Sequence, residues 1–395
     1  MKILQIVPSI SLVYGGPSQM ILGLAPALAE AGVKVTVLTT NSNGDRGQKP
    51  LNVPLNVPVT KDGYDIVYFR CAPFQRYKFS LDLCNWLNRY GNNFDLAHIH
   101  ALFSPVSSVA ANICRQKAIP YILRPLGTLD PADLRKKKFF KQVYAGILEK
   151  ANIAGAAAMH FTSEQESKVS HRFGAKTQDL VLPLGVYPPK IISAVENPIR
   201  SQFNIDDALP IILFMSRIDP KKGLDLLIPS LEKLLADGYN FHFVLAGTNP
   251  QDPNYEEKIK SQIHNSSLRS RTTITGFVTG EMKSALLQAA DIFVLPSYYE
   301  NFGIAVAEAM VAGKPVVISD QVHICNEVRD NNCGWVCPMD VPALTAALRT
   351  GLENPEERYK RGNSAKEYAL RQYSWQAIAQ QTVNAYERII SCYKN

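Results

Sequence analysis

Short apolar runs alternate with longer amphipathic stretches along the whole chain. In the first half, the runs that we predict as buried strands are Ile3–Val7, Val33–Leu38, Ile66–Phe69, Leu96–Ile99, Ile119–Leu123, Ala157–Phe161 and Leu180–Leu182. In the second half they are Ile211–Met215, Phe241–Ala246, Thr272–Thr275, Ile292–Leu295, Pro315–Ile318 and Gly334–Val336. Helical patterns such as Pro17–Ala31 separate most of them. This βαβ rhythm predicts an α/β fold with mostly parallel sheets covered on both faces.

The rhythm pauses once, in a proline-rich stretch at Tyr187–Pro198. A chain of 395 residues also suits two cores better than one. We therefore predict two doubly wound, Rossmann-like domains over residues 1–190 and 199–372, followed by a helix over residues 373–395 that crosses back to the first domain. Because ligands of such sheets bind beyond the carboxyl ends of the strands, the two domains would face each other across a binding cleft.

The charge is spread unevenly between the two halves. The net charge is +7, but residues 1–190 carry 22 Lys and Arg against 12 Asp and Glu, whereas residues 191–395 carry 20 against 23. A basic first half favours an anionic partner, such as a membrane surface or a pyrophosphate. One basic segment holds Arg135, Lys136, Lys137, Lys138 and Lys141 beside two phenylalanines. It predicts contact with an anionic membrane surface, with an ordinary solvated face as the alternative.

Several classes of protein are disfavoured by what the sequence lacks. The seven cysteines are scattered and form no CxxC pair, which argues against a disulfide framework or a zinc site and fits a reducing cytosol. The N-terminal residues do not follow the pattern of a signal peptide, and no run of 18 apolar residues occurs. No Asp-x-Asp pair stands at a predicted strand end, so we expect no bound metal. We expect a cytoplasmic protein, at most peripheral on the inner face of the membrane.

The segment Glu300–Glu308 follows the predicted strand Ile292–Leu295. From Gly303 to Val311 every residue except Glu308 is apolar, which predicts a buried helix. A carboxylate in such a helix needs hydrogen-bond partners, and the two neighbouring hydroxyls of a ribose would supply them. The alternative is that Glu308 pairs with a buried Lys or Arg. Glu300 precedes the helix, whose first N–H groups, near Phe302 to Ile304, could bind phosphate.

A second cluster lies where the predicted strand Ile211–Met215 leads into a helix near Leu224. Here Arg217 and Lys222 stand at a strand-to-helix corner, beside a helix N-terminus. Two fixed cations suit a diphosphate and could stabilise a departing nucleoside diphosphate without a metal. A solvated basic turn is the alternative.

Two further features of the first half are candidates for a site. Gly15 and Gly16 follow the first strand and would let the backbone approach a ligand, although an ordinary turn is the more common explanation of two glycines. His98 and His100 end the strand near Leu96–Ile99. Alternation along the strand places them on opposite faces, with His98 in the core and His100 as the site candidate.

Together these residues resemble the retaining glycosyltransferases of family 4, which have the GT-B fold. The resemblance covers nearly the whole chain. It is carried by Gly15-Gly16, His98-Ile99-His100, Phe161-Thr162-Ser163-Glu164, Arg217 with Lys222-Gly223, Gly276-Phe277-Val278, and Glu300 with Glu308 seven residues beyond it.

The resemblance implies a role for each of these positions. Arg217 and Lys222 would bind the donor diphosphate, Glu308 would hold the ribose hydroxyls, and Val278 would lie near the nucleobase. Glu300 would contact the donor sugar, with the backbone of Asn301, Phe302, Gly303 and Ile304 near sugar and phosphate. The first domain would bind the acceptor, with Gly15 and Gly16 closing on the donor and His100 on the acceptor side.

One departure from the family concerns the acceptor side. Many members have a His or Arg before the glycine that matches Gly127, and this chain has Leu126 there. We consider Arg124, two residues earlier, as a replacement for that group.

The resemblance implies a retaining, metal-independent transfer of a hexose from a UDP-sugar, with UDP-glucose as the expected donor. The acceptor would be a glycan or a lipid-linked oligosaccharide in exopolysaccharide or lipopolysaccharide synthesis. No cofactor besides the donor substrate and no nucleic acid is expected. Two alternatives stay open: a nucleotide-sugar-binding protein without turnover, and a sugar-nucleotide epimerase of the same fold.

Overall fold

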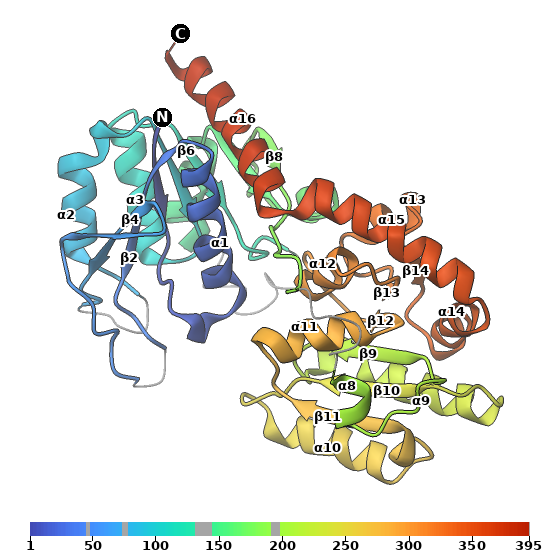
Figure 1. Cartoon of the computed structure of the whole chain (residues 1–395). Helices are drawn as coiled ribbons and strands as arrows, with labels where there is room; N and C mark the ends of the chain where they lie inside the picture. Colours follow the sequence, from blue (N-terminus) through green and yellow to red (C-terminus); the bar gives the residue numbers. More distant parts are fainter. Residues whose placement is uncertain (45–47, 73–77, 131–143, 191–197, 395) are drawn as a thin grey trace. The chain divides into compact units, whose positions relative to one another are not determined.

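The chain divides into two compact units (Figure 1). The structure is a computed structural model that describes residues 1–44, 48–72, 78–130, 144–190 and 198–394. Unit 1 consists of Met1–Gly185 and Trp375–Asn395, and unit 2 of Val186–Ser374. Unit 2 therefore includes residues 186–190, which we expected in the first domain, and the C-terminal helix is part of unit 1.

Unit 1 contains an eight-stranded sheet in the order β3-β4-β2-β1-β5-β6-β7-β8. Its strands are β1 (Lys2–Ile6), β2 (Lys34–Thr40), β3 (Pro58–Lys61), β4 (Tyr64–Phe69), β5 (Leu96–His100), β6 (Tyr121–Arg124), β7 (Ala158–Phe161) and β8 (Asp179–Val181). All neighbours pair in parallel except β3 and β4. Strand β3 was not predicted, because this mostly exposed edge strand has no apolar run.

Helices cover both faces of this sheet, as the sequence pattern predicts. They are α1 (Gly16–Glu30), α2 (Leu81–Tyr90), α3 (Pro105–Gln116), α6 (Lys150–Ala154), α7 (Glu164–Val169) and α16 (Trp375–Lys394). One buried apolar cluster joins the sheet to α1 and α16, and a second joins it to α2, α3 and α6. The C-terminal helix thus completes one of the two layers that cover the sheet.

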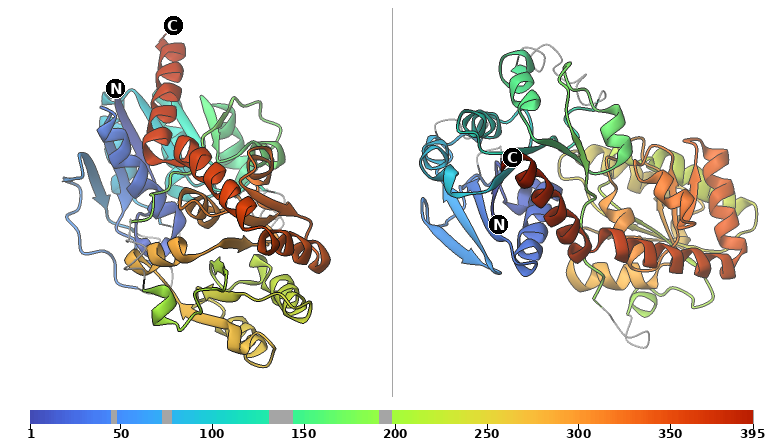
Figure 2. Two further views of the ribbon diagram at one scale, coloured as in Figure 1. Left: turned by 45° about the vertical axis from the view of Figure 1, so that its right-hand side comes forward. Right: turned by 90° about the horizontal axis from the view of Figure 1, so that it is seen from above.

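Helix α16 lies beside α1 (Figures 1 and 2) and begins with a tryptophan that fits against two glycines. A Cβ atom on Gly23 of α1 would lie 2.2 Å from Cζ2 of Trp375, and one on Gly185 would lie 2.2 Å from its Cε3. Both glycines are therefore needed for space. Trp375 itself is 8% exposed and belongs to the cluster that joins α16 to the sheet.

We expect Gly23→Ala to lower the free energy of unfolding of unit 1 by about 1–3 kcal/mol, the usual cost of overpacking a core. The added methyl group must displace the Trp375 ring, although alanine itself favours a helix. Denaturant unfolding followed by Trp fluorescence measures the change. Gly146→Ala is the matched control, since nothing lies within 4 Å of its Cβ position. Equal destabilisation by both variants would contradict the close fit.

Unit 2 contains a six-stranded parallel sheet in the order β11-β10-β9-β12-β13-β14. The strands are β9 (Ile211–Met215), β10 (His242–Ala246), β11 (Thr272–Gly276), β12 (Ile292–Leu295), β13 (Val316–Ser319) and β14 (Gly334–Cys337). The helices are α8 (Ile199–Gln202), α9 (Leu224–Ala236), α10 (Pro253–His264), α11 (Gly280–Ala289), α12 (Ile304–Val311), α13 (Cys325–Asp330), α14 (Val341–Glu353) and α15 (Pro355–Tyr373).

The strand order of unit 2 reverses direction at β9. The chain runs outward from β9 through β10 to β11, and then returns to the other side of β9 with β12. In doubly wound sheets the ligand crevice lies at this switch point, beyond the carboxyl ends of the strands. The segments that follow β9 and β12 are therefore where a ligand of unit 2 is expected.

Candidate functional site

The segment after β9 carries Arg217 and Lys222, and its shape depends on one glycine. Gly223 has φ +71°, and a Cβ atom there would lie 1.9 Å from the carbonyl oxygen of Pro296, just after β12. Only glycine permits this close approach of the two loops. The backbone N–H of Tyr298 also donates to the carbonyl oxygen of Lys221 at 2.7 Å. The fold thus brings the loops after β9 and β12 together at the switch point.

The approach of the two loops joins Lys222 to Glu300. Lys222 Nζ forms an ion pair with Glu300 Oε2, and the two side chains are 13% and 22% exposed. The backbone of Glu300 is fixed as well, because its N–H donates to Gln321 and its carbonyl accepts from the N–H of His323. Lys222, expected to bind phosphate, and Glu300, which the resemblance places at the donor sugar, therefore neutralise each other.

A buried asparagine that we did not predict supports the loop after β9. Asn249 is 1% exposed, and its side-chain amide donates to the carbonyl oxygen of Ile218 at 3.0 Å. Beside it, Gly247 lies so close to Ser216 that a Cβ atom would be 1.8 Å from the Ser216 carbonyl oxygen. Gly247 and Asn249 both follow β10, about 30 residues beyond Arg217 in the sequence. The residues around Arg217 therefore give no indication of these contacts.

Helix α12 begins at Ile304, four residues after Glu300. Gly303 is its N-cap residue with φ +84°, and no side chain caps the helix. Its first N–H groups therefore have no side-chain partner, which is the arrangement that binds phosphate at helix N-termini. The helix is largely buried, as predicted, and packs against α15. Asn301, Phe302 and Ile304 all lie in this turn, although the Phe302 ring itself is buried.

Glu308 lies one turn further along α12 and has a partner. Lys283 Nζ of α11 lies 2.5 Å from Glu308 Oε1. Glu308 therefore forms an ion pair with a lysine, which was the alternative to ribose binding. This lysine, however, is 34% exposed rather than buried. Glu308 is 17% exposed, so neither side chain of the pair is fully buried. Lys283 was missed because it precedes Glu308 by 25 residues and belongs to another helix.

The loop between β11 and α11 contains Val278 and leads into the helix of Lys283. Gly276 has φ +74°, Phe277 is 76% exposed and Val278 is half-buried. An exposed aromatic ring on a loop before a cationic helix suits a flat ring such as a nucleobase. Contact of Val278 with a nucleobase stays a prediction.

In unit 1, Gly15 and Gly16 form the start of α1. Gly15 has φ +69° and is the N-cap of the helix, without a side-chain cap. Nothing lies within 4 Å of its Cβ position, so its conformation rather than crowding requires glycine. This geometry fits both an ordinary turn and an approach to a ligand.

His100 does not reach a ligand surface. The expectation that His98 and His100 face opposite sides was wrong, because side chains two residues apart on a strand share one face. Their rings stack with centroids 4.4 Å apart, and both are fully buried. With His160 of β7 and Tyr386 of α16 they form a buried chain of hydrogen bonds, which we call the histidine chain.

The direction of each hydrogen bond in the histidine chain follows from its last acceptor. His160 Nε2 lies 2.9 Å from the carbonyl oxygen of Leu182, which can only accept, so His160 Nδ1 accepts from His98 Nε2 at 3.0 Å. His98 Nδ1 then accepts from the Tyr386 hydroxyl at 2.7 Å. That hydroxyl accepts from Gln5, whose side-chain oxygen accepts from His100 Nε2 at 2.8 Å.

The histidine chain is closed only when its imidazoles are neutral. Burial lowers the pKa of His98 and His100 well below its usual value and lowers that of His160 to about 3. The positive charge of Arg124 nearby lowers all three further. These histidines therefore fasten α16 to the sheet, and a role of the buried His100 on the acceptor side stays a prediction.

Arg124, the expected replacement at the acceptor side, is also buried. It is 3% exposed, and burial lowers its pKa to about 10, while the charge of Glu166 opposes that shift. Within the described residues its Nε and Nη1 atoms have no hydrogen-bond partner. Leu126 instead faces a cavity, with its backbone at φ +56°. The structure thus does not present Arg124 as a surface substitute for the missing His or Arg.

The basic segment with Arg135, Lys136, Lys137, Lys138 and Lys141 lies outside the described residues. Across the described ranges, no helix combines the length and the apolar character that crossing a membrane requires. In the same ranges, no three His, Cys, Asp or Glu side chains gather as metal ligands would.

Two family models match the chain in succession. Residues 15–185 match the "Glycosyl transferase 4-like domain", and residues 195–368 match "Glycosyl transferases group 1". Among curated relatives, the alpha-D-kanosaminyltransferase of Streptomyces kanamyceticus is 31% identical over 192 residues, which is 48% of each chain. The chain thus spans about half the length of this relative. The phosphatidyl-myo-inositol mannosyltransferase of Mycolicibacterium smegmatis is 26% identical over 98% of this chain and 94% of its own.

Solved structures with low identity share the fold. A sucrose-phosphate synthase from Thermosynechococcus elongatus superimposes with a TM-score of 0.74 at 21% identity, covering 99% of this chain and 100% of that one. Anabaena Alr3699/HepE, solved in complex with UDP and glucose, gives 0.73 at 19%, covering 98% and 100%. The resemblance read from the sequence and the expected fold class are confirmed: the chain belongs to the family 4 glycosyltransferases with the GT-B fold.

Proposed function

We propose that the chain transfers a hexose from a UDP-sugar to a glycan or a lipid-linked oligosaccharide, with retention of configuration and without a divalent metal. UDP-glucose is the donor that we favour, and synthesis of exopolysaccharide or lipopolysaccharide is the setting. The relatives bear the names of kanosaminyl and mannosyl transferases, so the donor sugar varies among them. A structural neighbour was solved with UDP and glucose, which supports the glucosyl assignment for this chain.

The observation that carries the proposal is the pair of ion pairs beside the uncapped start of α12. Lys222 is held by Glu300 and Lys283 by Glu308, so two cations and two carboxylates lie next to free backbone N–H groups. A UDP-sugar offers what each group lacks: phosphate oxygens for the lysines and N–H groups, and hydroxyls for the carboxylates. Donor binding would therefore exchange two internal pairs for contacts with ligand.

The same arrangement suits the transfer step. The bond between the sugar and the diphosphate breaks while the acceptor oxygen bonds to the same carbon, and the acceptor proton passes to an oxygen of the departing diphosphate. Negative charge grows on that diphosphate, and Arg217 and Lys222 would stabilise it where it develops. Glu300 would orient the donor sugar by accepting hydrogen bonds from the hydroxyl groups of that sugar. A cytoplasmic location, with the basic segment at residues 135–141 on the membrane, stays a prediction.

Glu308→Gln tests the donor site. The change replaces one carboxylate oxygen by an NH2 donor and removes the negative charge that faces the ribose hydroxyls and Lys283, so we expect the Kd for UDP to rise about 10- to 100-fold, as loss of charge-assisted hydrogen bonds predicts. Isothermal titration calorimetry with UDP and a panel of nucleotide sugars gives the values. Glu357→Gln is the matched control, because it breaks an ion pair with Arg361 on α15.

The outcomes of this experiment separate the alternatives. Unchanged UDP binding in Glu308→Gln, or no binding of any nucleotide by the wild type, would refute the donor site. Tight binding without release of UDP on acceptor extracts would favour the nucleotide-sugar-binding protein without turnover. Release of UDP together with a glycosylated product supports the transferase.

A further inference from the structure

Strand β8 is the last strand of the sheet in unit 1 and has an open edge. Among the described strands only β7 pairs with it, on its inner side. The N–H of Leu182, just after β8, donates to the carbonyl oxygen of Phe161 in β7 at 2.9 Å. Backbone groups of successive residues point to opposite edges of a strand, so the N–H and C=O groups of Asp179 and Val181 point outward. Such a row of groups is a template for a further strand.

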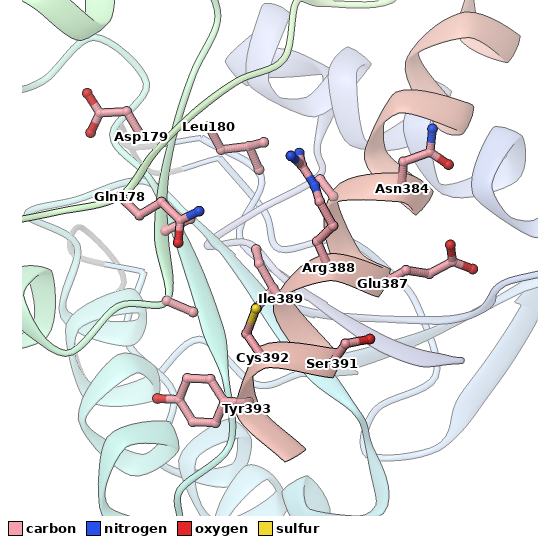
Figure 3. Close-up of a pocket in the computed structure, with 13 residues that line it drawn as sticks. Gln178, Asp179, Leu180, Asn384, Glu387, Arg388, Ile389, Ser391, Cys392 and Tyr393 are labelled. Carbon is pink, nitrogen blue, oxygen red and sulfur yellow. The ribbon is translucent and has the colours of Figure 1, made fainter. Parts of the chain in front are cut away.

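A groove of about 820 Å³ lies beside β8, between this strand and the later turns of α16 (Figure 3). Three alanines in its lining, Ala157, Ala158 and Ala385, leave its space unfilled. Leu180 lines it from β8 and packs against the apolar cluster that joins α16 to the sheet. Ala157 directly precedes β7, so the groove lies at the amino ends of these strands, whereas small ligands of doubly wound sheets bind at the carboxyl ends. The groove therefore suits a macromolecular partner.

The charges at the groove favour a partner with the same balance of signs. Glu387 and Arg388 of α16 line the groove next to each other, and both are exposed. On β8, Asp179 already forms an ion pair with Arg172. Two copies of this rim can therefore meet without a surplus of like charge, and a strongly acidic or basic partner is not favoured.

One register suits two copies of β8 better than its neighbours do. A two-fold axis makes the copies antiparallel, and an axis at Leu180 places Asp179 opposite the partner's Val181. Both residues point outward, so all of their outward N–H and C=O groups are paired in this register. An axis at Asp179 would place two aspartates directly opposite each other, which is destabilising. An axis at Val181 would place Asp179 opposite Pro183, which has no N–H to donate.

We propose that the open edge of β8 is a dimer interface, at which a second copy of this chain pairs antiparallel about a two-fold axis at Leu180. The sheets of the two copies of unit 1 then form one continuous sheet, with both α16 helices on the same face. The two Leu180 side chains meet on that face, because side chains are closest in a pair of opposite residues that exchange no hydrogen bond. Each leucine closes the open side of the other copy's groove. This interface does not depend on the transferase function.

Sedimentation-velocity ultracentrifugation of the full-length chain over a series of concentrations tests the interface. We expect a monomer–dimer equilibrium with a Kd of about 1–100 µM, the range of a small interface. Val181→Pro removes an outward N–H that the pairing with β7 does not use, and it should raise the dimer Kd at least about tenfold. Val181→Thr keeps that N–H and is the matched control, with a Kd within about threefold of the wild type.

A cysteine pair tests the register. Leu180→Cys in a Cys392→Ser background places two thiols opposite each other across the axis, at a Cα separation that a disulfide accepts. Oxidation with diamide, which takes up the two thiol hydrogens, should then give a covalent dimer on a non-reducing gel. Val181→Cys in the same background is the control, because its two copies lie on either side of the axis and too far apart for a disulfide. The change at Cys392 removes the exposed cysteine, and the others are buried.

Several results would overturn the proposal. A wild type that stays monomeric up to about 100 µM would refute the dimer. The same dimer Kd for Val181→Pro and the wild type would place the contact elsewhere on the molecule. Covalent dimers formed as readily by Val181→Cys as by Leu180→Cys would refute the register. Growth beyond the dimer would contradict the two-fold contact, since such a contact closes on itself.

Folding and donor binding are measured on the same preparations. Circular dichroism and thermal unfolding show whether Val181→Pro keeps the fold, and if it does not, the cysteine pair decides alone. The UDP affinity of each variant should equal that of the wild type, because the groove lies at the amino ends of the strands. A chain that dimerises as expected but binds no nucleotide would refute the donor site and leave the interface in place.

Discussion

Lys222→Met is expected to lower kcat by about 10²- to 10³-fold, the loss that follows removal of one fixed group that stabilises developing charge. The Kd for UDP should change less, because the charge that Lys222 meets is largest in the transition state. Initial rates with the best donor of the panel, together with UDP titrations, separate the two effects. Lys221→Met, at the exposed neighbouring position, is the control.

Two further variants, Glu300→Gln and Lys222→Arg, separate the loss of the Lys222 charge from the loss of its ion pair with Glu300. Lys222→Met also leaves Glu300 without its cation, so Glu300→Gln is needed beside it. That variant keeps the cation and should weaken the sugar-dependent part of donor binding, seen as a smaller difference between the nucleotide sugar and UDP. Lys222→Arg keeps the charge but changes its shape, and should restore only part of the rate. A kcat of Lys222→Met within about threefold of the wild type would refute the charge-stabilising role.

Acidification from pH 7.5 to pH 5.0 is expected to destabilise unit 1 strongly. The histidine chain holds three neutral imidazoles whose folded pKa lies below that of the unfolded chain. The unfolded state therefore binds protons first, so the stability is complete above about pH 6.5 and is lost as the pH falls. Each histidine contributes up to about 2 kcal/mol of loss at pH 5, and the three together up to about 6 kcal/mol.

Denaturant unfolding at several pH values measures this loss. His100→Gln should be less stable than the wild type at pH 7.5 but should lose about 2 kcal/mol less between pH 7.5 and pH 5.0, since one proton-binding group is gone. His171→Asn, at an exposed position, serves as the control. The groups that face the histidine chain are Arg124, Gln5 and Tyr386. The control variant must leave these three side chains unchanged. Identical stability at both pH values would contradict the direction of the pKa shifts.

Strands buried on both sides were predictable from the sequence, and an exposed one was not. Strands β9 and β12 match the predicted ranges, because an all-apolar run of four or five residues can only be a buried segment. Strand β3 has no such run and pairs only through its backbone. The wrong faces for His98 and His100 have a different cause: residues two positions apart on a strand share one face, so alternation places both rings on the same side.

Residues of the candidate site were predictable from the sequence only where they are close to one another along the chain. Arg217 and Lys222 share one corner, and Glu300 and Glu308 one strand-to-helix segment. Lys283 and Asn249 meet that site through folding, from other strand ends. The buried Glu149 and Glu166 are likewise indistinguishable from surface carboxylates in sequence. Glu149 accepts from an N–H group 46 residues away, and Glu166 accepts from one that is 39 residues away as well as from the N–H of nearby Thr162.

The position of α16 has a consequence for how the protein is made. Residues 1–185 leave the ribosome first, but the part of one sheet face that lies beside α1 and under α16 stays uncovered until α16 has been synthesised after all of unit 2. Unit 2 is continuous in sequence and gains its contacts earlier. We therefore expect the second unit to complete its folding before the first, reversing the usual order of folding during synthesis. Through that interval the nascent chain carries an apolar sheet surface of the kind that chaperones bind.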